Sequence, residues 1–185
     1  MKHILRPSIT LLVVAAAITA LLSFVNELTA EPIERQRKIV QEKTMGEVFP
    51  AADYFIETDA ELAGNIIGIF QAISGGQPVG YVIELAAPGY ADVIHMMVGV
   101  SLSDERLTGM RVLGHRETPG LGSAITNESF YRRFDNRALV PLRVVKGAPG
   151  EHEIDSLASA TITTAAVTDA VNEAIEWTLG GDILP

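Results

Sequence analysis

Residues 7–26 carry no charged side chain, and this segment sets the first limit on how the chain can fold. An α-helix rises about 1.5 Å per residue, so about 20 residues cross the roughly 30 Å hydrocarbon core of a bilayer. Lys2, His3 and Arg6 precede the segment, whereas Glu27 follows it. Because positive charge on the shorter flank stays in the cytoplasm, the sequence predicts a cytoplasmic N-terminus and a domain on the far side of the membrane.

The apolar segment is either a retained transmembrane anchor or a cleaved signal peptide. Residues 28–30, Leu-Thr-Ala, form a poor cleavage site, and the apolar run is longer than that of a usual signal peptide, which favours the anchor. The 185 residues then divide into a cytoplasmic end and anchor (1–27), a juxtamembrane helix and linker (28–48) and an extracytoplasmic domain (49–185). In a Gram-negative cell this arrangement places the anchor in the inner membrane and the domain in the periplasm.

Composition and motifs exclude several classes of function. A formal net charge of -9 argues against a nucleic-acid partner, because no basic face is available to displace counterions from phosphates. The chain has no cysteine, which excludes thiolate-held iron–sulfur clusters, c-type haem attachment and disulfides. The four histidines lack metal-ligand spacing, so no metal site is predicted. No dinucleotide-binding fingerprint, P-loop or nucleophile elbow is present either.

The middle of the chain is rich in predicted strands. Residues 66–73 and 79–85 form one expected hairpin around a glycine-rich turn, and residues 91–102 and 107–115 form a second. Flanking segments have other patterns: a charged helix from Pro32 to about Thr44, a loop over 46–53, a short helix over 127–134 and a strand over 139–145 that Pro141 would confine to a sheet edge. The sequence therefore predicts an α+β fold, with an antiparallel sheet flanked by helices.

Near the C-terminus, a run of small and hydroxyl-bearing residues leads into a helical pattern. Apolar and small residues spaced by three and four predict a helix that packs one face inward; these positions are Thr164, Val167, Val171, Ala174 and Ile175. Thr163 or Thr164 is the expected N-cap of this helix, and Gly180-Gly181 is its expected end. Thr161 would then lie just outside the helix N-terminus, where free N–H groups favour an anion. Its hydroxyl is able to hold a phosphate or to be esterified by one. The alternative is a capped turn without a ligand.

A second stretch, His-Arg-Glu-Thr-Pro-Gly-Leu-Gly at residues 115–122, follows a predicted strand. Its proline and glycines predict an unusual backbone path beside polar side chains. Taken alone, this stretch favours a structural Pro-Gly turn.

Together the two stretches resemble a known family. Residues 155–163 resemble the Asp-x-x-(Ser/Thr/Ala)-Gly-Ala-Thr-x-Thr signature of the FMN-binding domain in the G subunit of the Rnf electron-transport complex, and a similar signature is found in the C subunit of the sodium-translocating NADH:quinone reductase. Glu-Thr-Pro-Gly-Leu-Gly is a second motif of these proteins, and Gly89-Tyr90 matches a third. Ser159 stands where the family usually has Gly, and it would be mildly strained if that position needs a positive φ. The sodium-pump protein is usually longer, which favours the Rnf family.

The resemblance implies a covalent FMN, joined through a phosphoester bond to the threonine at the position of Thr161. It also implies a flavin site made by the residues at matching positions: Ser159, Ala160, Thr163, Thr164, Glu117, Thr118, Gly120 and Leu121. A separate Mg-dependent flavin transferase would install FMN from FAD and recognise Asp155, for which an Asx turn is the alternative role.

The function expected from the resemblance is electron transfer on FMN within the membrane-bound Rnf complex, an ion-translocating oxidoreductase. The chain would act as a carrier without an acid or base of its own, in contact with the membrane and with other membrane subunits. Three alternatives remain open: the C subunit of the sodium-pumping quinone reductase, another extracytoplasmic flavoprotein, and a membrane-tethered binding or scaffold module without a cofactor.

Overall fold

The computed structural model describes residues 2–60 and 62–180 and divides into two compact units, Met1–Val40 and Gln41–Pro185. Helix α1 (Lys2–Val48) begins in the first unit and ends in the second. The helix therefore continues through Pro32, where the sequence predicted the start of a separate charged helix. Anchor and charged segment are one element.

The first unit consists of α1 alone, and its side chains from residue 6 to residue 40 are exposed. An 18-residue window of this helix has a mean hydropathy of 2.4, and none of the window is buried. By length and composition, α1 is long and apolar enough to cross a membrane, and no other helix within the described residues is. This property is consistent with single-pass anchoring.

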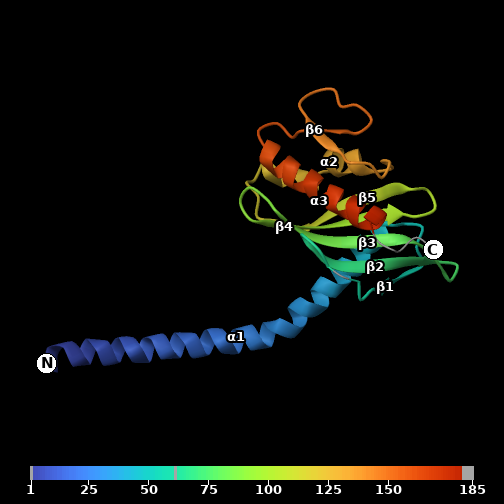
Figure 1. The fold of residues 1–185 in the computed structure, drawn as a ribbon. Coiled ribbons are helices and arrows are strands. Elements are labelled where there is room, and N and C mark those ends of the chain that lie inside the picture. The colour runs from blue at the N-terminus through green and yellow to red at the C-terminus, as the bar shows by residue number, and fades with distance from the viewer. Residues whose placement is uncertain (1, 61, 181–185) are drawn as a thin grey trace. The chain divides into compact units, whose positions relative to one another are not determined.

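The second unit is built on a five-stranded antiparallel sheet (Figure 1). Its strands follow one another in chain order: β1 (Tyr54–Glu57), β2 (Ile66–Ser74), β3 (Gln77–Pro88), β4 (Val93–Ser101) and β5 (Arg106–Gly114). Both predicted hairpins and the α+β fold are confirmed, whereas β1 was not predicted. Gly75 and Gly76 join β2 to β3 with φ values of 57° and 77°, which a two-residue hairpin turn requires and glycine adopts without strain.

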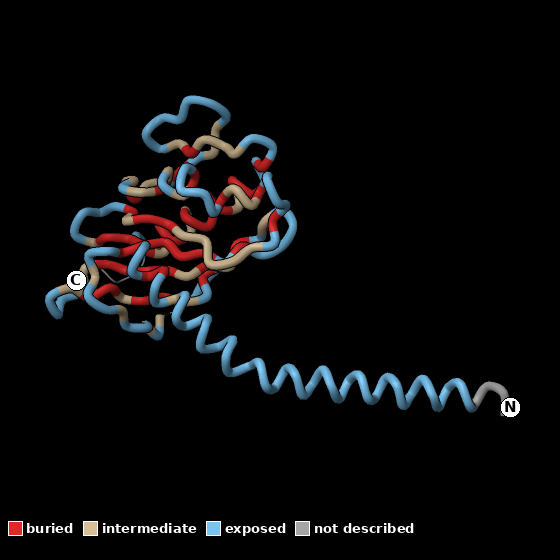
Figure 2. The backbone as a smooth tube through the Cα atoms, turned by 180° about the vertical axis from the view of Figure 1, so that it is seen from behind, coloured by how far each residue is buried: buried red, intermediate tan, exposed pale blue. Residues whose placement is uncertain are grey.

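Helix α3 (Thr161–Gly180) packs on one face of this sheet. All five positions predicted to face inward are buried, and the four apolar ones belong to one core cluster with alternate residues of β3 and β4, such as Ile83 and Met96. The described part of α3 ends at Gly180, the first residue of the expected stop, and Gly181 lies outside the described residues. The main core therefore lies between α3 and the sheet. Figure 2 shows the buried residues gathered inside this unit.

The opposite face of the sheet is covered by the end of α1 and the residue after it. Met45, Val48 and Phe49 pack there against Val82 and Met97 in a second apolar cluster. The sequence predicted a loop over residues 46–53, and this was wrong for its first part. Packing of this turn against the sheet outweighs the low helix propensity of a glycine within it.

Several short elements complete the unit: η1 (Gly122–Thr126), α2 (Glu128–Tyr131), η2 (Arg132–Phe134), β6 (Arg143–Val145) and β7 (Glu153–Asp155). The predicted helix over 127–134 corresponds to α2 and η2. The strand predicted over 139–145 was too long, because only β6 is a strand, and it pairs in parallel with β7 in a sheet of its own. At Leu142 the backbone N–H and C=O bond instead to the side chain of Asn172 on α3, at 2.8 and 2.9 Å.

Candidate functional site

Helix α3 begins at Thr161, earlier than the sequence predicted. The carbonyl of Ala160 accepts the first intrahelical hydrogen bond, from the N–H of Thr164 at 3.0 Å. Ser159 lies in the left-handed region with φ of 63°, so the chain turns sharply there before it enters the helix. Thr161 is thus the first helical residue rather than a residue outside the helix.

Thr164, one of the two predicted caps, has a different role. It is fully buried, its hydroxyl donates to the carbonyl of Ala160 at 2.9 Å, and it accepts the N–H of Leu157 at 3.1 Å. These bonds hold the loop before the helix against the first turn. The prediction that Thr163 or Thr164 caps the helix was therefore wrong, although both residues lie in its first turn.

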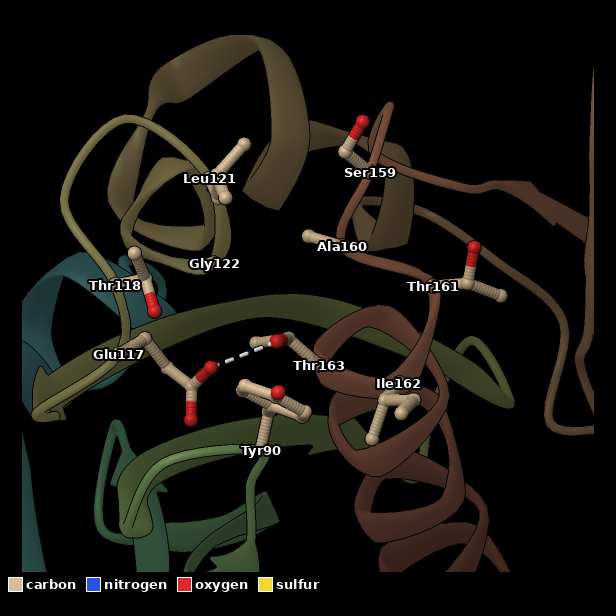
Figure 3. A pocket seen from close by; sticks show the side chains of 10 residues that line it. All are labelled: Tyr90, Glu117, Thr118, Leu121, Gly122, Ser159, Ala160, Thr161, Ile162 and Thr163. Carbon is tan, nitrogen blue, oxygen red and sulfur yellow. Dashed lines mark hydrogen bonds between the residues drawn. The ribbon is translucent and has the colours of Figure 1, made fainter.

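The two sequence motifs, which are far apart in the chain, meet at one cavity of about 390 Å³ (Figure 3). The 115–122 stretch forms one wall, and the segment that leads into α3 forms the other. The cavity is lined by Tyr90, Glu117, Thr118, Leu121, Gly122, Ser159, Ala160, Thr161, Ile162 and Thr163. Its volume lies within the roughly 300–1,000 Å³ typical of sites for small molecules and cofactors.

A hydrogen bond between buried side chains joins the two walls. The hydroxyl of Thr163 donates to Oε2 of Glu117 at 2.7 Å, and the backbone N–H of Ala91 donates to Oε1 at 2.9 Å. Glu117 is 4% exposed and Thr163 is 2% exposed. The carboxylate therefore connects three segments: its own loop, the turn before β4 and the first turn of α3.

Two glycines make room for this carboxylate. A Cβ on Gly89 would lie 2.4 Å from Oε1 of Glu117, and a Cβ on Gly122 would lie 2.5 Å from Oε2. Both distances are shorter than any normal contact, so a larger residue at either position would push the carboxylate out of place. The sequence motifs contain these glycines because the carboxylate occupies the space that their side chains would need.

Burial raises the pKa of the Glu117 carboxyl, but several hydrogen bonds act in the opposite sense and prevail. They come from the N–H of Ala91, the hydroxyl of Thr163 and the N–H groups of Tyr90 and Asp92, and the pKa falls below its ordinary value of 4.5. Glu117 is therefore a carboxylate at neutral pH.

Thr161 is exposed on the wall opposite Glu117 (Figure 3). Its Oγ1 accepts a hydrogen bond from the hydroxyl of Ser156 at 3.1 Å. The first N–H groups of a helix have no intrahelical partner and favour an anion. An exposed hydroxyl and these free N–H groups thus lie at the same end of α3.

Three apolar side chains border the cavity and remain open to solvent. Tyr90 is 67% exposed, Leu121 42% and Ile162 60%, although each is large. Sequence reasoning did not name Tyr90, Gly122 or Ile162 as site residues. The matches at Gly89-Tyr90 and Leu121-Gly122 were the available signals for the first two, whereas Ile162 occupies the variable position of Thr-x-Thr.

Two residues predicted at the flavin site lie elsewhere. Thr164 does not line the cavity, and Gly120, with φ of 77°, shapes the loop and donates its N–H to the hydroxyl of Ser123 at 2.9 Å. The other predicted site residues line it: Glu117, Thr118, Leu121, Ser159, Ala160, Thr161 and Thr163.

Asp155, the predicted recognition residue, ends β7 and lies outside the cavity. Its Oδ1 accepts the N–H of Gly147 at 3.0 Å, and its Oδ2 lies 4.0 Å from a guanidinium nitrogen of Arg133. The carboxylate thus stabilises the loop that joins β6 to β7.

The geometry suits a ligand with an anionic end and a flat apolar part. The anion would lie at the N-terminus of α3, and the apolar part would lie between Tyr90, Leu121 and Ile162. No group of three His, Asp or Glu side chains within the described range is placed to hold a metal ion. The residues present therefore fit a phosphorylated aromatic cofactor such as FMN.

Comparisons with known proteins agree with this geometry. Residues 89–176 match the model of the FMN-binding domain, and residues 1–48 match that of the RnfG N-terminal region. The G subunit of the ion-translocating oxidoreductase complex of Methanosarcina acetivorans is 32% identical over 185 residues, which is 95% of each chain. The protein of the same name from Yersinia pestis is 34% identical and covers 94% of this chain and 90% of its own.

A solved structure shares the fold. The C subunit of the Na(+)-translocating NADH-quinone reductase of Parabacteroides distasonis superimposes with a TM-score of 0.51 at 23% identity, over 60% of each chain. At this identity the likeness concerns the fold alone, whereas the relatives from ion-translocating oxidoreductase complexes match almost end to end. The chain therefore belongs to the RnfG family, the G subunits of ion-translocating oxidoreductase (Rnf) complexes, and carries that family's FMN-binding domain.

Proposed function

We propose that the chain transfers electrons on a single FMN that is bonded through its phosphate to Oγ1 of Thr161. One observation carries the proposal: the exposed hydroxyl of Thr161 and the 115–122 loop line the same cavity. The domain that contains both belongs to an FMN-binding family. The relatives are named as subunits of ion-translocating complexes, so this chain would work beside the other membrane subunits of such a complex.

The attachment step would be a phosphoryl-type transfer from FAD, catalysed by a separate flavin transferase. The bond between Thr161 Oγ1 and the FMN phosphorus forms, the pyrophosphate bond of FAD breaks, AMP leaves with the bonding electrons and the hydroxyl proton passes to the transferase. The phosphate would then accept hydrogen bonds from the free N–H groups at the start of α3. Asp155 would belong to the surface that the transferase recognises.

Within the loaded domain, FMN supplies the redox chemistry, and the chain supplies its position and surroundings. Tyr90, Leu121 and Ile162 would pack against the ring system, and Thr118 would offer a hydroxyl at the rim. The hydrogen bond from Thr163 to Glu117 would keep the two walls at a fixed separation. Such a carrier needs no general acid or base of its own.

The proposed location follows from α1. Its apolar part would span the inner membrane with the N-terminus in the cytoplasm, because the basic residues lie before it. The FMN domain would then lie in the periplasm. A covalent bond suits that compartment, because an attached cofactor does not depend on a pool of free FMN.

The test is co-production of the full chain with a flavin transferase, followed by a denaturing gel under ultraviolet light and by intact mass measurement. The wild type should give a fluorescent band and the mass of one added FMN, less water. Thr161→Val keeps the shape but removes the hydroxyl and should abolish both signals, whereas Thr161→Ser should keep them. Ser156→Ala is the matched control, because it removes the neighbouring hydroxyl only. Flavin that remains on Thr161→Val would overturn the assignment, and an unmodified wild type would favour a cofactor-free scaffold.

A further inference from the structure

Glu117 is the one residue of the cavity lining that carries a charge at neutral pH. Within the described residues it forms no ion pair, and the neighbouring Arg116 pairs instead with Asp92 at 3.5 Å, with 85% of the arginine side chain exposed. The first turn of α3, on the opposite wall, contains no acidic residue that would add a second negative charge. The cavity lining therefore contains one negative charge, and no cationic side chain among the described residues is paired with it.

This charge is also fixed in place. The donors Ala91 and Thr163 hold the two carboxylate oxygens at 2.9 and 2.7 Å, and these oxygens lie in the space that Gly89 and Gly122 leave open. The backbone of the same residue is also held, because Nδ1 of His115 accepts the N–H of Glu117 at 3.1 Å. A buried charge of this kind is screened much less by solvent and salt than an exposed one.

We infer that Glu117 lowers the reduction potential of the flavin in this cavity. The inference rests on the proposed function. A one-electron carrier that passes an electron to the flavin is itself oxidised by one electron, and the flavin gains one negative charge unless a proton follows. The Glu117 carboxylate opposes that gain, so it stabilises the oxidised flavin relative to the reduced one.

The experiment is a potentiometric titration at pH 7 of the FMN-loaded full chain and three loaded variants. Glu117→Gln removes the charge and should shift the reduction equilibrium at least tenfold toward the reduced flavin, a rise of about 59 mV for one electron. Thr163→Val removes the hydrogen bond that the threonine hydroxyl donates to the Glu117 carboxylate, but it keeps the charge. The charge is then less compensated, so the reduction potential of the flavin should fall. Asp92→Asn removes an exposed carboxylate and should cause a much smaller rise.

The opposite signs separate charge from loosened structure. If Glu117→Gln and Thr163→Val both raise the potential by the same amount, the effect belongs to the lost hydrogen bond, and the inference is wrong. It is also wrong if Glu117→Gln shifts the potential no more than Asp92→Asn does. Should Glu117→Gln fail to accumulate with flavin, Thr163→Val alone decides, because a rise in its potential contradicts the inference.

Failure of this inference is distinguishable from failure of the proposed function. Absence of covalent flavin from the wild type would overturn the proposed function before any titration. Covalent flavin with equal potentials in the wild type and Glu117→Gln would overturn only the role of Glu117.

Discussion

The two faces of the five-stranded sheet are both buried, but they are built in different ways. On the face that α1 covers, Met45, Val48 and Phe49 pack directly on the strands, and the cluster is apolar throughout. On the face that α3 covers, the apolar core ends at a cavity whose wall contains the buried pair Glu117 and Thr163. The first face is stabilised by apolar packing alone, whereas the second face combines apolar packing with a polar site at its edge.

The difference assigns separate tasks to the two faces. The face beneath α1 leaves no spare volume, since a Cβ on Gly80 would lie 2.5 Å from Cε2 of Phe49 and one on Gly99 would lie 2.7 Å from Cγ1 of Val48. Changes there should cost stability. The cavity side instead leaves large side chains such as Tyr90 open to solvent, and changes there should affect the cofactor more than the fold.

The largest effect is expected from Phe49→Ala. Phe49 is 2% exposed, and removal of a buried aromatic ring typically costs about 3–5 kcal/mol of the free energy of unfolding. Tyr90→Ala, on the cavity side, should change that free energy by less than about 1 kcal/mol, because the side chain is 67% exposed. Thermal and urea unfolding of the full chain in detergent measure both. Equal losses would remove the distinction between the two faces.

The next largest effect is expected from Gly80→Ala, which should lower the free energy of unfolding by about 2–3 kcal/mol. The new methyl group would meet the carbonyl oxygen of Val100 at 2.2 Å as well as the ring of Phe49, and the backbone atom cannot move aside cheaply. Gly46→Ala is the matched control, because its Cβ meets nothing within 4 Å and the residue lies in α1. In this control the free energy of unfolding should rise by about 0.5–1 kcal/mol, because alanine favours the helix more than glycine does. A stable Gly80→Ala would mean that the strands can separate from residue 49.

A smaller effect should appear in acid and should belong to the cavity side alone. The pKa of Glu117 is lowered in the folded state, so its ionised form adds stability that is fully present above pH 4.5 and is lost as the pH falls through the folded pKa. Unfolding measured from pH 6 to pH 3 should show this loss in the wild type, and Glu117→Gln should lack this part of the acid sensitivity. Identical pH profiles would mean that the hydrogen bonds do not favour the ionised carboxylate.

The smallest effect is expected from Ser159→Gly. Ser159 adopts φ of 63°, a conformation that costs a side-chain-bearing residue about 1 kcal/mol or more and costs glycine little. The greater freedom of glycine in the unfolded chain offsets part of this gain, so the midpoint of thermal unfolding should rise by about 1–3 °C. Ala158→Gly, one residue earlier and not at positive φ, should lower it instead. A fall with Ser159→Gly would show that the serine hydroxyl contributes more than the strain costs.

The sequence predicts the central hairpins and α3 well, because alternating apolar residues, glycine turns and spacings of three and four are local signals. It fails where distant contacts decide. Residues 46–48 are helical because Val48 packs on the sheet, and β6 is short because Asn172 of α3 satisfies the backbone of Leu142. The four residues of β1 lie at the sheet edge with little burial, so they show no pattern of strand alternation.

The candidate site follows the same rule. Both motifs are visible in the sequence, and strain at Ser159 was correctly tied to a positive φ, which the residue adopts. The bond between Thr163 and Glu117 spans 46 positions, so no local pattern predicts it. The start of α3 was placed too late because the hydroxyl of Thr164 bonds to the preceding loop, which a capping rule does not distinguish from a cap.

The place where α1 ends has a consequence for recombinant work on the second unit of the chain. A truncation at residue 49, the boundary that the sequence suggests, deletes Met45 and Val48 and leaves Phe49 as the one residue of this turn that still packs on Phe70, Val82 and Met97. Such a fragment would expose apolar surface and would be prone to aggregate. A fragment that starts at Gln41 keeps the last turns of the helix on that surface and should be less prone to aggregate.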